Sequence, residues 1–357
     1  MLEIFENILY VGPEKKYGGI GSVIDVYSKN IKNFKFIPTY PSPSSLNSGF
    51  RFKIYRIYFF LKSILLISKA LLTDKRIKLL HIHSAHKGSF FRKSIICYIG
   101  RIWGKKIVFH IHSGNFPSFY KHSGIFKYFI RKTLIGCNAV VCLSEQWEEY
   151  YIKELGLSNI KIIGNPIQLD RIEGFKRNTD GVIRLLFLGK VCDAKGIFDL
   201  IEFLKNNRYF KENRIQLTIA GNGEVERLKP LLDRNIEFIG WINDARKEEA
   251  FAACDIYVLP SYYEGLPISI LEAMASSKPI ISTNVGGIPS ILQNGFNGWL
   301  IEPVSFKELD RVFEEIFTNM DILELYASNS FIESKKYSPD VIINKLSLLY
   351  QSILNTE

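Results

Sequence analysis

The chain has 357 residues, of which 47% are hydrophobic and 23% charged, a balance typical of globular proteins. This composition excludes a disordered or collagen-like chain, and the length predicts two domains. The five cysteines are an odd number scattered mostly through apolar runs, which indicates reduced, buried thiols. They lack the paired spacing of a zinc site, so no metal site is expected.

The net charge of +10 is unevenly distributed. Residues 1–165 contain 25 Lys and Arg against 9 Asp and Glu, whereas residues 166–357 contain 21 against 27. Residues 51–100 contain eleven basic residues and a single acid, Asp74, and aromatic side chains lie between the basic ones. We expect the first half to contact an anionic partner such as a membrane surface, although a core helix with solvated lysines would give the same pattern. Nucleic acid is not expected, because no binding motif accompanies the charge.

No membrane-spanning segment is predicted. The most apolar stretch, residues 57–72, is too short to cross a bilayer and contains Lys62 and Lys69. The first residues include acids where a secretory signal has basic residues, so no signal peptide is expected. The predicted location is the cytoplasm.

Short apolar runs alternate with longer helix-like stretches along the whole chain. Runs of this length between helical segments are typical of parallel strands that are buried on both faces. The two series of runs therefore predict two doubly wound α/β domains, 1–166 and 167–338. The apolar periodicity is lost between Asn165 and Asp180, and Pro339 opens a last helix that needs a surface to pack on. The runs are 7–12, 78–84, 106–112, 139–144 and 161–164, then 183–189, 216–221, 236–240, 255–260 and 279–284.

Several loops between a predicted strand and helix can hold a phosphate. The glycine-rich loops 18–22 and 221–223 are weak signals, since neither has the GxGxxG or GxxxxGK[ST] pattern. Lys190 and Lys195 lie five residues apart at a strand end and a helix start, so both can reach one phosphate group. Either lysine alone would be typical of surface charge.

The segment 255–292 is the most informative. A strand ends at a loop containing Glu264, Gly265 and Leu266, and Pro267 suits the first position of the next helix. The amides of such a helix N-terminus favour an anion. Glu272 lies eight residues after Glu264, and two carboxylates so placed can accept hydrogen bonds from sugar or ribose hydroxyls. Alternatively, Glu272 could satisfy amides of the following loop.

Together these motifs resemble the retaining glycosyltransferases of family 4, which have the GT-B fold. The resemblance rests on the motifs GGI, HIH, AVVCLSE, NPI, FLGK-x4-KG, AGNGE, FIGW and the E-x7-E block followed by VGGIPSIL. It implies two Rossmann-like domains facing across a cleft. Residues 1–166 would bind the acceptor and 167–338 the nucleotide sugar, while the helix in 339–357 would cross back onto the N-terminal domain.

The resemblance also assigns donor-binding roles. Lys190 and Lys195 match the basic pair on the donor diphosphate, although the family more often has Arg at the place of Lys190. Glu272 matches the ribose ligand, and Glu264 matches the catalytic acid that faces the donor sugar. The remaining matches are Gly265 and Leu266, beside the sugar and phosphate, and Gly19, in a loop that closes over the diphosphate.

All six histidines lie between residues 81 and 122, in the predicted acceptor domain. His112 matches the family's histidine near the reacting sugar and is the second predicted catalytic residue. We expect His110 to point to the opposite face of its strand, into the core. His83 and His86 are alternative contacts for acceptor or phosphate.

The function implied by the resemblance is transfer of a hexose or N-acetylhexosamine, with retention, from a nucleotide sugar to a hydroxyl of a lipid-linked or polysaccharide acceptor. A UDP-sugar is favoured, and the setting would be bacterial capsule, O-antigen or exopolysaccharide synthesis at the inner face of the plasma membrane. The chain contains no Asp-x-Asp, so we expect lysines and a helix N-terminus, with no metal or cofactor, to stabilise the leaving group. The alternatives are a non-catalytic sugar-nucleotide-binding subunit, which the intact E-x7-E block argues against, and an epimerase or phosphorylase.

Overall fold

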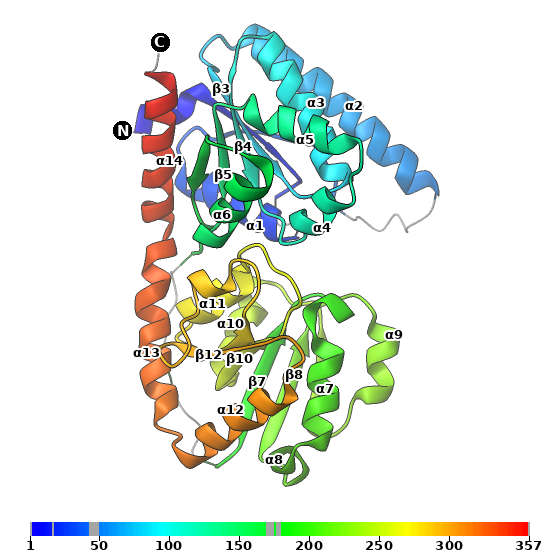
Figure 1. The fold of residues 1–357 in the computed structure, drawn as a ribbon, viewed down its shortest axis with the longest axis vertical. Helices are drawn as coiled ribbons and strands as arrows, with labels where there is room; N and C mark the ends of the chain where they lie inside the picture. Colours follow the sequence, from blue (N-terminus) through cyan, green and yellow to red (C-terminus); the bar gives the residue numbers. More distant parts are fainter. Residues whose placement is uncertain (1, 16–17, 43–49, 169–174, 176–179, 356–357) are drawn as a thin grey trace. The chain divides into compact units, whose positions relative to one another are not determined.

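The chain divides into two compact units, one made of Met1–Pro166 with Pro339–Glu357 and one of Ile167–Ser338. The computed structural model describes residues 2–15, 18–42, 50–168, 175 and 180–355. Part of the segment that loses its apolar periodicity, 169–174 and 176–179, therefore lies outside the described residues. Figure 1 shows strands and helices in both units.

The described part of unit 1 contains a six-stranded sheet in which every neighbouring pair is parallel. Strands β2 and β3 lie on opposite sides of β1, so the direction in which successive strands are added to the sheet reverses at β1. Ligands in such sheets bind at this reversal, beyond the carboxyl ends of the strands. In spatial order the strands are β2 (Lys35–Pro38), β1 (Ile8–Gly12), β3 (Leu79–Ser84), β4 (Lys106–Ile111), β5 (Ala139–Cys142) and β6 (Ile160–Ile162).

Helices of unit 1 connect these strands, and the last helix of the chain completes its core. Tyr350, in α14, is fully buried and its ring packs edge-on against Phe5 with centroids 5.8 Å apart. Its hydroxyl lies 3.1 Å from that of Tyr10 in β1. The helices are α1 (Gly18–Asn30), α2 (Phe50–Thr73), α3 (Gly88–Ile102), α4 (Phe116–Lys121), α5 (Phe126–Ile135), α6 (Glu145–Leu155) and α14 (Pro339–Leu354).

The described part of unit 2 has its own six-stranded parallel sheet, in the order β12 (Gly298–Ile301), β11 (Ile280–Thr283), β10 (Ile256–Leu259), β7 (Ile183–Leu188), β8 (Ile215–Ala220) and β9 (Ile236–Gly240). The chain order reverses between β7 and β10. The helices are α7 (Ile197–Asn206), α8 (Arg208–Lys211), α9 (Val225–Leu228), α10 (Asp244–Ala253), α11 (Ile268–Ala275), α12 (Phe306–Thr318) and α13 (Ile322–Ser334).

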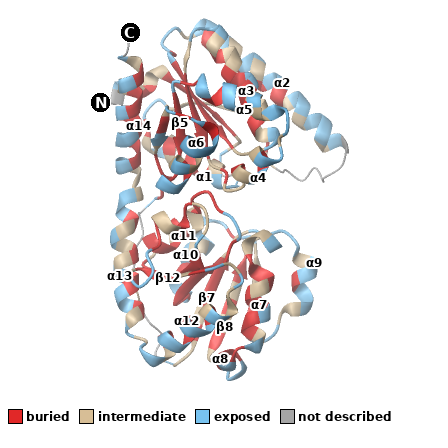
Figure 2. Ribbon diagram, in the orientation of Figure 1, coloured by how far each residue is buried: buried red, intermediate tan, exposed pale blue. Residues whose placement is uncertain are grey.

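These sheets confirm the predicted fold class of two parallel α/β arrangements. Figure 2 shows that the strands of each sheet are largely buried. Strands covered on both faces by helices need apolar side chains on both faces, which is why they appear in the sequence as continuous apolar runs.

Helix α2 has two apolar faces. Its inner face contains the buried residues Phe60, Ile67 and Leu71. Five large apolar residues at helical spacing lie exposed on the opposite side, which we call the outer face of α2: Ile54, Tyr58, Leu61, Leu65 and Leu72. Figure 2 colours much of this helix as exposed. Within the described residues, no helix is both long and apolar enough to cross a bilayer.

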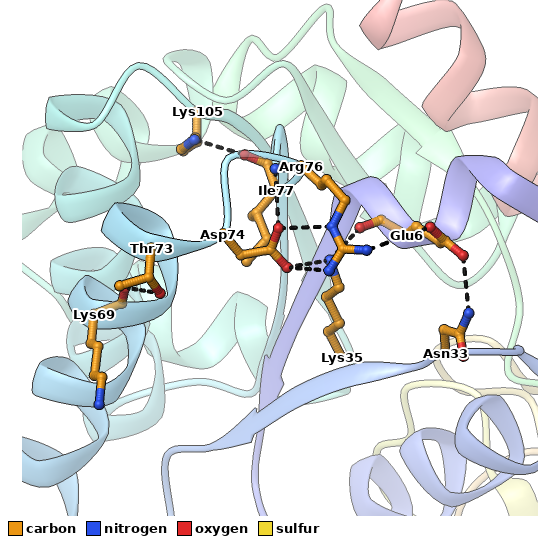
Figure 3. A network of polar contacts seen from close by, with 9 residues as sticks. All are labelled: Glu6, Asn33, Lys35, Lys69, Thr73, Asp74, Arg76, Ile77 and Lys105. Carbon is orange, nitrogen blue, oxygen red and sulfur yellow. Dashed lines mark hydrogen bonds and ion pairs between the residues drawn. The ribbon is translucent and has the colours of Figure 1, made fainter.

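A polar network ties together the segments at the amino edge of the sheet in unit 1 (Figure 3). Asp74 bonds to Lys35 at 2.7 Å and to Arg76 at 3.0 Å, while Asn33 donates to Glu6 at 2.9 Å. Hydrogen bonds from Arg76 and Lys35 hold the pKa of Asp74 well below its usual range. The acids at this edge therefore neutralise the nearby cations.

Candidate functional site

Two loops meet at the reversal point of the sheet in unit 2. One follows β7 and leads into α7, and the other follows β10 and leads into α11. The backbone amide of Tyr262 donates to the carbonyl of Ala194 at 3.0 Å, which joins them. Gly196 has φ +69°, and a Cβ there would lie 2.0 Å from the carbonyl oxygen of Pro260. The close approach of the loops therefore requires a glycine at this position.

This junction brings together two residues that the sequence singled out. The ammonium group of Lys195 forms an ion pair with Oε1 of Glu264. The hydroxyl of Ser261 donates to the same oxygen at 2.7 Å. The Glu264 residue is only 8% exposed, whereas the Lys195 side chain is 28% exposed. The result is a mostly buried carboxylate beside a cation that remains accessible.

The second acid of the E-x7-E block has a partner that the sequence did not indicate. Oε1 of Glu272, on α11, accepts a hydrogen bond from Lys247 of α10 at 2.6 Å. Burial lowers the pKa of Lys247, but the charge and hydrogen bond of Glu272 outweigh that effect and leave the pKa above its usual value. Among the described residues, the amide of Ser276 donates to the backbone carbonyl of Glu272 at 3.0 Å, but no amide of the following loop donates to its carboxylate, so the alternative role considered for this side chain is not observed.

The other predicted residues of unit 2 lie on the same two loops. Lys190 is exposed, and no ion pair involving it is recorded in the described part of the chain. Gly265 and Leu266 are buried, and the carbonyl of Gly265 accepts a hydrogen bond from Gly287 at 2.9 Å. Pro267 precedes α11 in an extended conformation, so the helix starts one residue later than predicted.

Gly19 lies in the first turn of α1 and is exposed. The sequence placed it in a loop between strand and helix. The helix instead begins at Gly18, whose φ of +62° marks the turn into it.

His112 directly follows β4, and both of its ring nitrogens are bonded within unit 1. Nδ1 lies 3.1 Å from Oδ1 of Asn165, and Nε2 lies 2.9 Å from Nδ1 of His83. Burial lowers the pKa of His112 to about 3, despite a smaller opposing effect of the Asn165 bond, so the ring is neutral. Because an amide oxygen only accepts, Nδ1 of His112 carries the proton, and Nε2 accepts from His83. Another donor would have to displace His83 from Nε2.

The prediction that the side chain of His110 points to the opposite face of its strand from His112 was wrong. Residues two apart on a strand share a face, and the rings of His110 and His112 stack with centroids 4.0 Å apart. His110 is nevertheless fully buried, as expected for a core residue. Of the two alternative contacts, His83 is also fully buried, whereas His86 is partly exposed and lies 2.5 Å from the hydroxyl of Ser113.

The described residues contain one group of ligand atoms close enough to hold a metal ion, from His81, His83 and His110, all within 4.8 Å of one another. Nε2 of His81 already bonds to Nδ1 of His110 at 3.1 Å. The group is fully buried and includes no carboxylate, so an ion there would be costly to desolvate. Hydrogen bonds join His81 to His110 and His83 to His112, while Nε2 of His83 and Nε2 of His110 are buried without a hydrogen-bond partner among the described residues.

Comparison with known proteins identifies the family. Residues 170–331 match the family described as "Glycosyl transferases group 1", and residues 29–171 match "Glycosyltransferase Family 4". Together the two matches cover most of both units. The chain belongs to glycosyltransferase family 4.

This glycosyltransferase has relatives of similar length. It is 27% identical over 326 residues to an uncharacterised glycosyltransferase of Methanocaldococcus jannaschii, covering 83% of this chain and 76% of the relative. It is 28% identical over 271 residues to the UDP-Gal:α-D-GlcNAc-diphosphoundecaprenol α-1,3-galactosyltransferase of Escherichia coli, covering 68% and 66%.

A solved structure supports the GT-B fold of this glycosyltransferase. Anabaena HepE, in complex with UDP and glucose, matches with a TM-score of 0.76 at 17% identity, covering 97% of this chain and 99% of HepE. At this identity the likeness establishes the fold alone.

Proposed function

We propose that this glycosyltransferase moves a hexose or N-acetylhexosamine from a UDP-sugar to a hydroxyl of a lipid-linked or polysaccharide acceptor, with retention at the anomeric carbon. The observation that carries the proposal is the Lys195–Glu264 pair at the reversal point of unit 2, with Lys190 on the first of the two loops and Glu272 on α11, which follows the second. The HepE complex with UDP and the galactosyltransferase relative that uses UDP-Gal support the choice of donor.

In the proposed reaction the acceptor oxygen forms a bond to the anomeric carbon while that carbon's bond to the donor phosphate breaks. The electron pair leaves with the nucleoside diphosphate, and the acceptor's proton passes to a phosphate oxygen. Lys190 and Lys195 stabilise the charge that develops on the diphosphate. Glu272 accepts hydrogen bonds from the ribose, and Glu264 faces the donor sugar, beside the backbone of Gly265 and Leu266.

We also propose substrate contacts for two residues of unit 1. Gly19, exposed in the first turn of α1, contacts the diphosphate. His112 accepts a hydrogen bond from a hydroxyl of the reacting sugar at Nε2. This bond replaces the one that Nε2 accepts from His83. The Nδ1–H bond from His112 to Asn165 keeps the ring oriented during this replacement.

The proposed enzyme needs no metal ion or other cofactor. The cationic groups already described supply the stabilisation that a divalent ion provides in other sugar-transfer enzymes. The N-terminus of α11 adds a partial positive charge above the same loops.

We further propose that the enzyme binds the inner face of a bacterial plasma membrane, where surface polysaccharides are assembled. The outer face of α2 exposes apolar side chains, and the helix also contains five basic residues and no acid. Such a helix suits the boundary between headgroups and acyl chains of an anionic bilayer. A second copy of the chain is a poorer fit for this face, because two such helices would place like charges together.

A donor screen tests the function. The purified protein is incubated with UDP- and GDP-sugars and lipid-diphosphate monosaccharides, with EDTA present. Product from a UDP-sugar in EDTA supports both the donor and the metal independence, and NMR of the product gives the anomeric configuration. Nucleotide binding without any product would favour the non-catalytic binding subunit, and loss of nucleotide binding would refute the donor site.

A further inference from the structure

A cluster of cations lies at the carboxyl edge of the sheet in unit 1, where β2 and β3 end. The ring of Tyr40, which follows β2, has the guanidinium of Arg56 at 4.9 Å and that of Arg92 at 5.0 Å from its centroid. Both arginines are half-buried and belong to different helices, α2 and α3. One aromatic ring thus holds two guanidinium groups in place, each through a cation–π contact.

Arg92 is incompletely satisfied. Its Nε is buried and has no hydrogen-bond partner. The side chain folds back over the start of α3, since a Cβ added to Gly88 would lie 3.3 Å from its Nη1. Burial and the charge of Arg56 together lower the pKa of Arg92. An anion at this point would meet a guanidinium and the positive end of a 15-residue helix.

Lys93, the next residue of α3, is only 2% exposed. No carboxylate is recorded as its partner in the part of the chain that the structure describes. Burial, followed by the charge of Arg92, lowers its pKa well below the usual value. An apolar residue would stabilise the fold better than a lysine at this position, because burying an uncompensated charge is destabilising. Packing alone therefore does not explain the lysine.

Acids of unit 1 lie at both edges of the sheet. At the amino edge, Asp74 pairs with Lys35 and Arg76 (Figure 3). At the carboxyl edge, Glu14 accepts a hydrogen bond from the backbone amide of Ser42 at 2.7 Å, and no ion pair links it to the cation cluster among the described residues. Within the described residues, no ion pair joins an acid of either edge to Arg56, Arg92 or Lys93.

We propose that Arg56, Arg92 and Lys93 form a binding subsite for the phosphate groups of the acceptor, the diphosphate of a lipid-linked saccharide. This inference rests on the proposed function, and it names the acceptor class. The planar guanidinium groups suit bidentate contacts to phosphate oxygens, and the lysine adds a compact charge. His112 follows β4 at the same edge of the sheet, so a diphosphate held here places the attached saccharide on the side of the proposed catalytic histidine.

Binding of farnesyl diphosphate and of inorganic pyrophosphate, measured by calorimetry, tests the subsite. The protein is first saturated with UDP, so that unit 2 is occupied. We expect Arg92→Gln and Lys93→Met to weaken farnesyl diphosphate binding at least tenfold, with partial recovery in Arg92→Lys. The control Lys153→Gln removes an exposed charge from α6 of the same unit and should change binding less than twofold.

Transfer assays separate the two sources of phosphate. If the subsite serves the acceptor, the variants raise KM for a lipid-diphosphate acceptor at least tenfold with kcat nearly unchanged. Variants that lose pyrophosphate binding but keep the acceptor KM would overturn the acceptor assignment in favour of free phosphate. Wild-type protein that binds UDP but neither diphosphate would refute the subsite while leaving the donor site intact.

Stability gives an independent readout for Lys93. Lys93→Met should melt at a higher temperature than the wild type while binding the acceptor less well, since it removes a buried charge and keeps the side-chain volume. A lower melting temperature would indicate a structural role for Lys93 and count against the proposal.

Discussion

Substituting methionine for Lys195 should affect stability and activity by separate mechanisms. Lys195→Met keeps most of the side-chain volume but leaves Glu264 without its cation. That carboxylate belongs to a residue only 8% exposed, and it retains the hydrogen bond from Ser261. The stability loss should therefore be smaller than that of a fully buried pair broken on one side.

The magnitude follows from these contacts. Breaking a buried ion pair on one side costs about 3–5 kcal/mol. Partial exposure of Lys195 and the remaining Ser261 bond reduce this to about 2 kcal/mol. For a unit the size of Ile167–Ser338, about 2 kcal/mol lowers the melting temperature by about 4–8 °C. Loss of one group that stabilises the leaving diphosphate should lower kcat by about 10²–10³-fold.

The double variant Lys195→Met/Glu264→Gln distinguishes the two effects. It removes both charges, so its melting temperature should return towards the wild-type value while its transfer activity stays low. The measurements are differential scanning calorimetry and initial transfer rates with a UDP-sugar. Lys229→Met is a matched control, because Lys229 pairs with Glu226 on the exposed surface of the same unit and should change neither quantity measurably.

Two results would contradict this reasoning. A double variant as unstable as Lys195→Met would mean that the uncompensated charge of Glu264 is not the cause. Activity that recovers together with stability would mean that Lys195 acts on the fold and not on the donor.

Further predictions concern the nucleotide, the histidines and the membrane. Glu272→Ala should weaken UDP binding by calorimetry about tenfold, and Lys247→Met should do so less; unchanged affinity in Glu272→Ala would refute the ribose role. Burial lowers the pKa of His112 to about 3, against about 6.5 in the unfolded chain. The unfolded chain therefore binds a proton more readily, and unit 1 should lose stability as the pH falls from about 6.5 towards 3. Calorimetry at several pH values measures this loss. An acid transition common to both units would count against that cause. Leu65→Glu should reduce sedimentation with phosphatidylglycerol vesicles, whereas Ile332→Glu, an exposed apolar residue of unit 2, should not; equal binding by Leu65→Glu would exclude α2 as the contact.

The sequence was sufficient for the two sheets and for one feature of the candidate site. Apolar runs between helical segments predicted the parallel strands, and parallel strands bring their carboxyl ends to one edge. Lys195 and Glu264 were each predicted as donor ligands beyond strand ends of this sheet, and the structure shows in addition that they form an ion pair. Their roles in catalysis stay predictions.

Other contacts depend on packing that local sequence does not reveal. Lys247 lies among charged residues that are typical of a solvated helix face, so only the packing of α10 near α11 reveals its bond to Glu272. Tyr40 and the two arginines around it, Arg56 and Arg92, lie on three separate segments of the chain. The orientation of His110 was mispredicted because residues two apart on a strand lie on the same face, so His110 and His112 share one. Pro267 precedes α11 because its backbone is extended. Proline fixes φ but allows both helical and extended values of ψ, so the sequence could not distinguish the two positions.

The close contact between the two loops of unit 2 also limits how this enzyme could be re-engineered. Backbone lies directly against backbone at Gly196 and Pro260, so a side chain introduced there would separate the loops. Tyr262 and Tyr263, on the second loop, are 38% and 43% exposed. A library intended to change sugar preference should therefore diversify these two tyrosines and leave the glycine unchanged. Replacing Tyr262 removes the hydrogen bond that its hydroxyl donates to Asp199 of α7 at 2.9 Å, whereas the backbone bond from Tyr262 to Ala194 does not depend on the side chain.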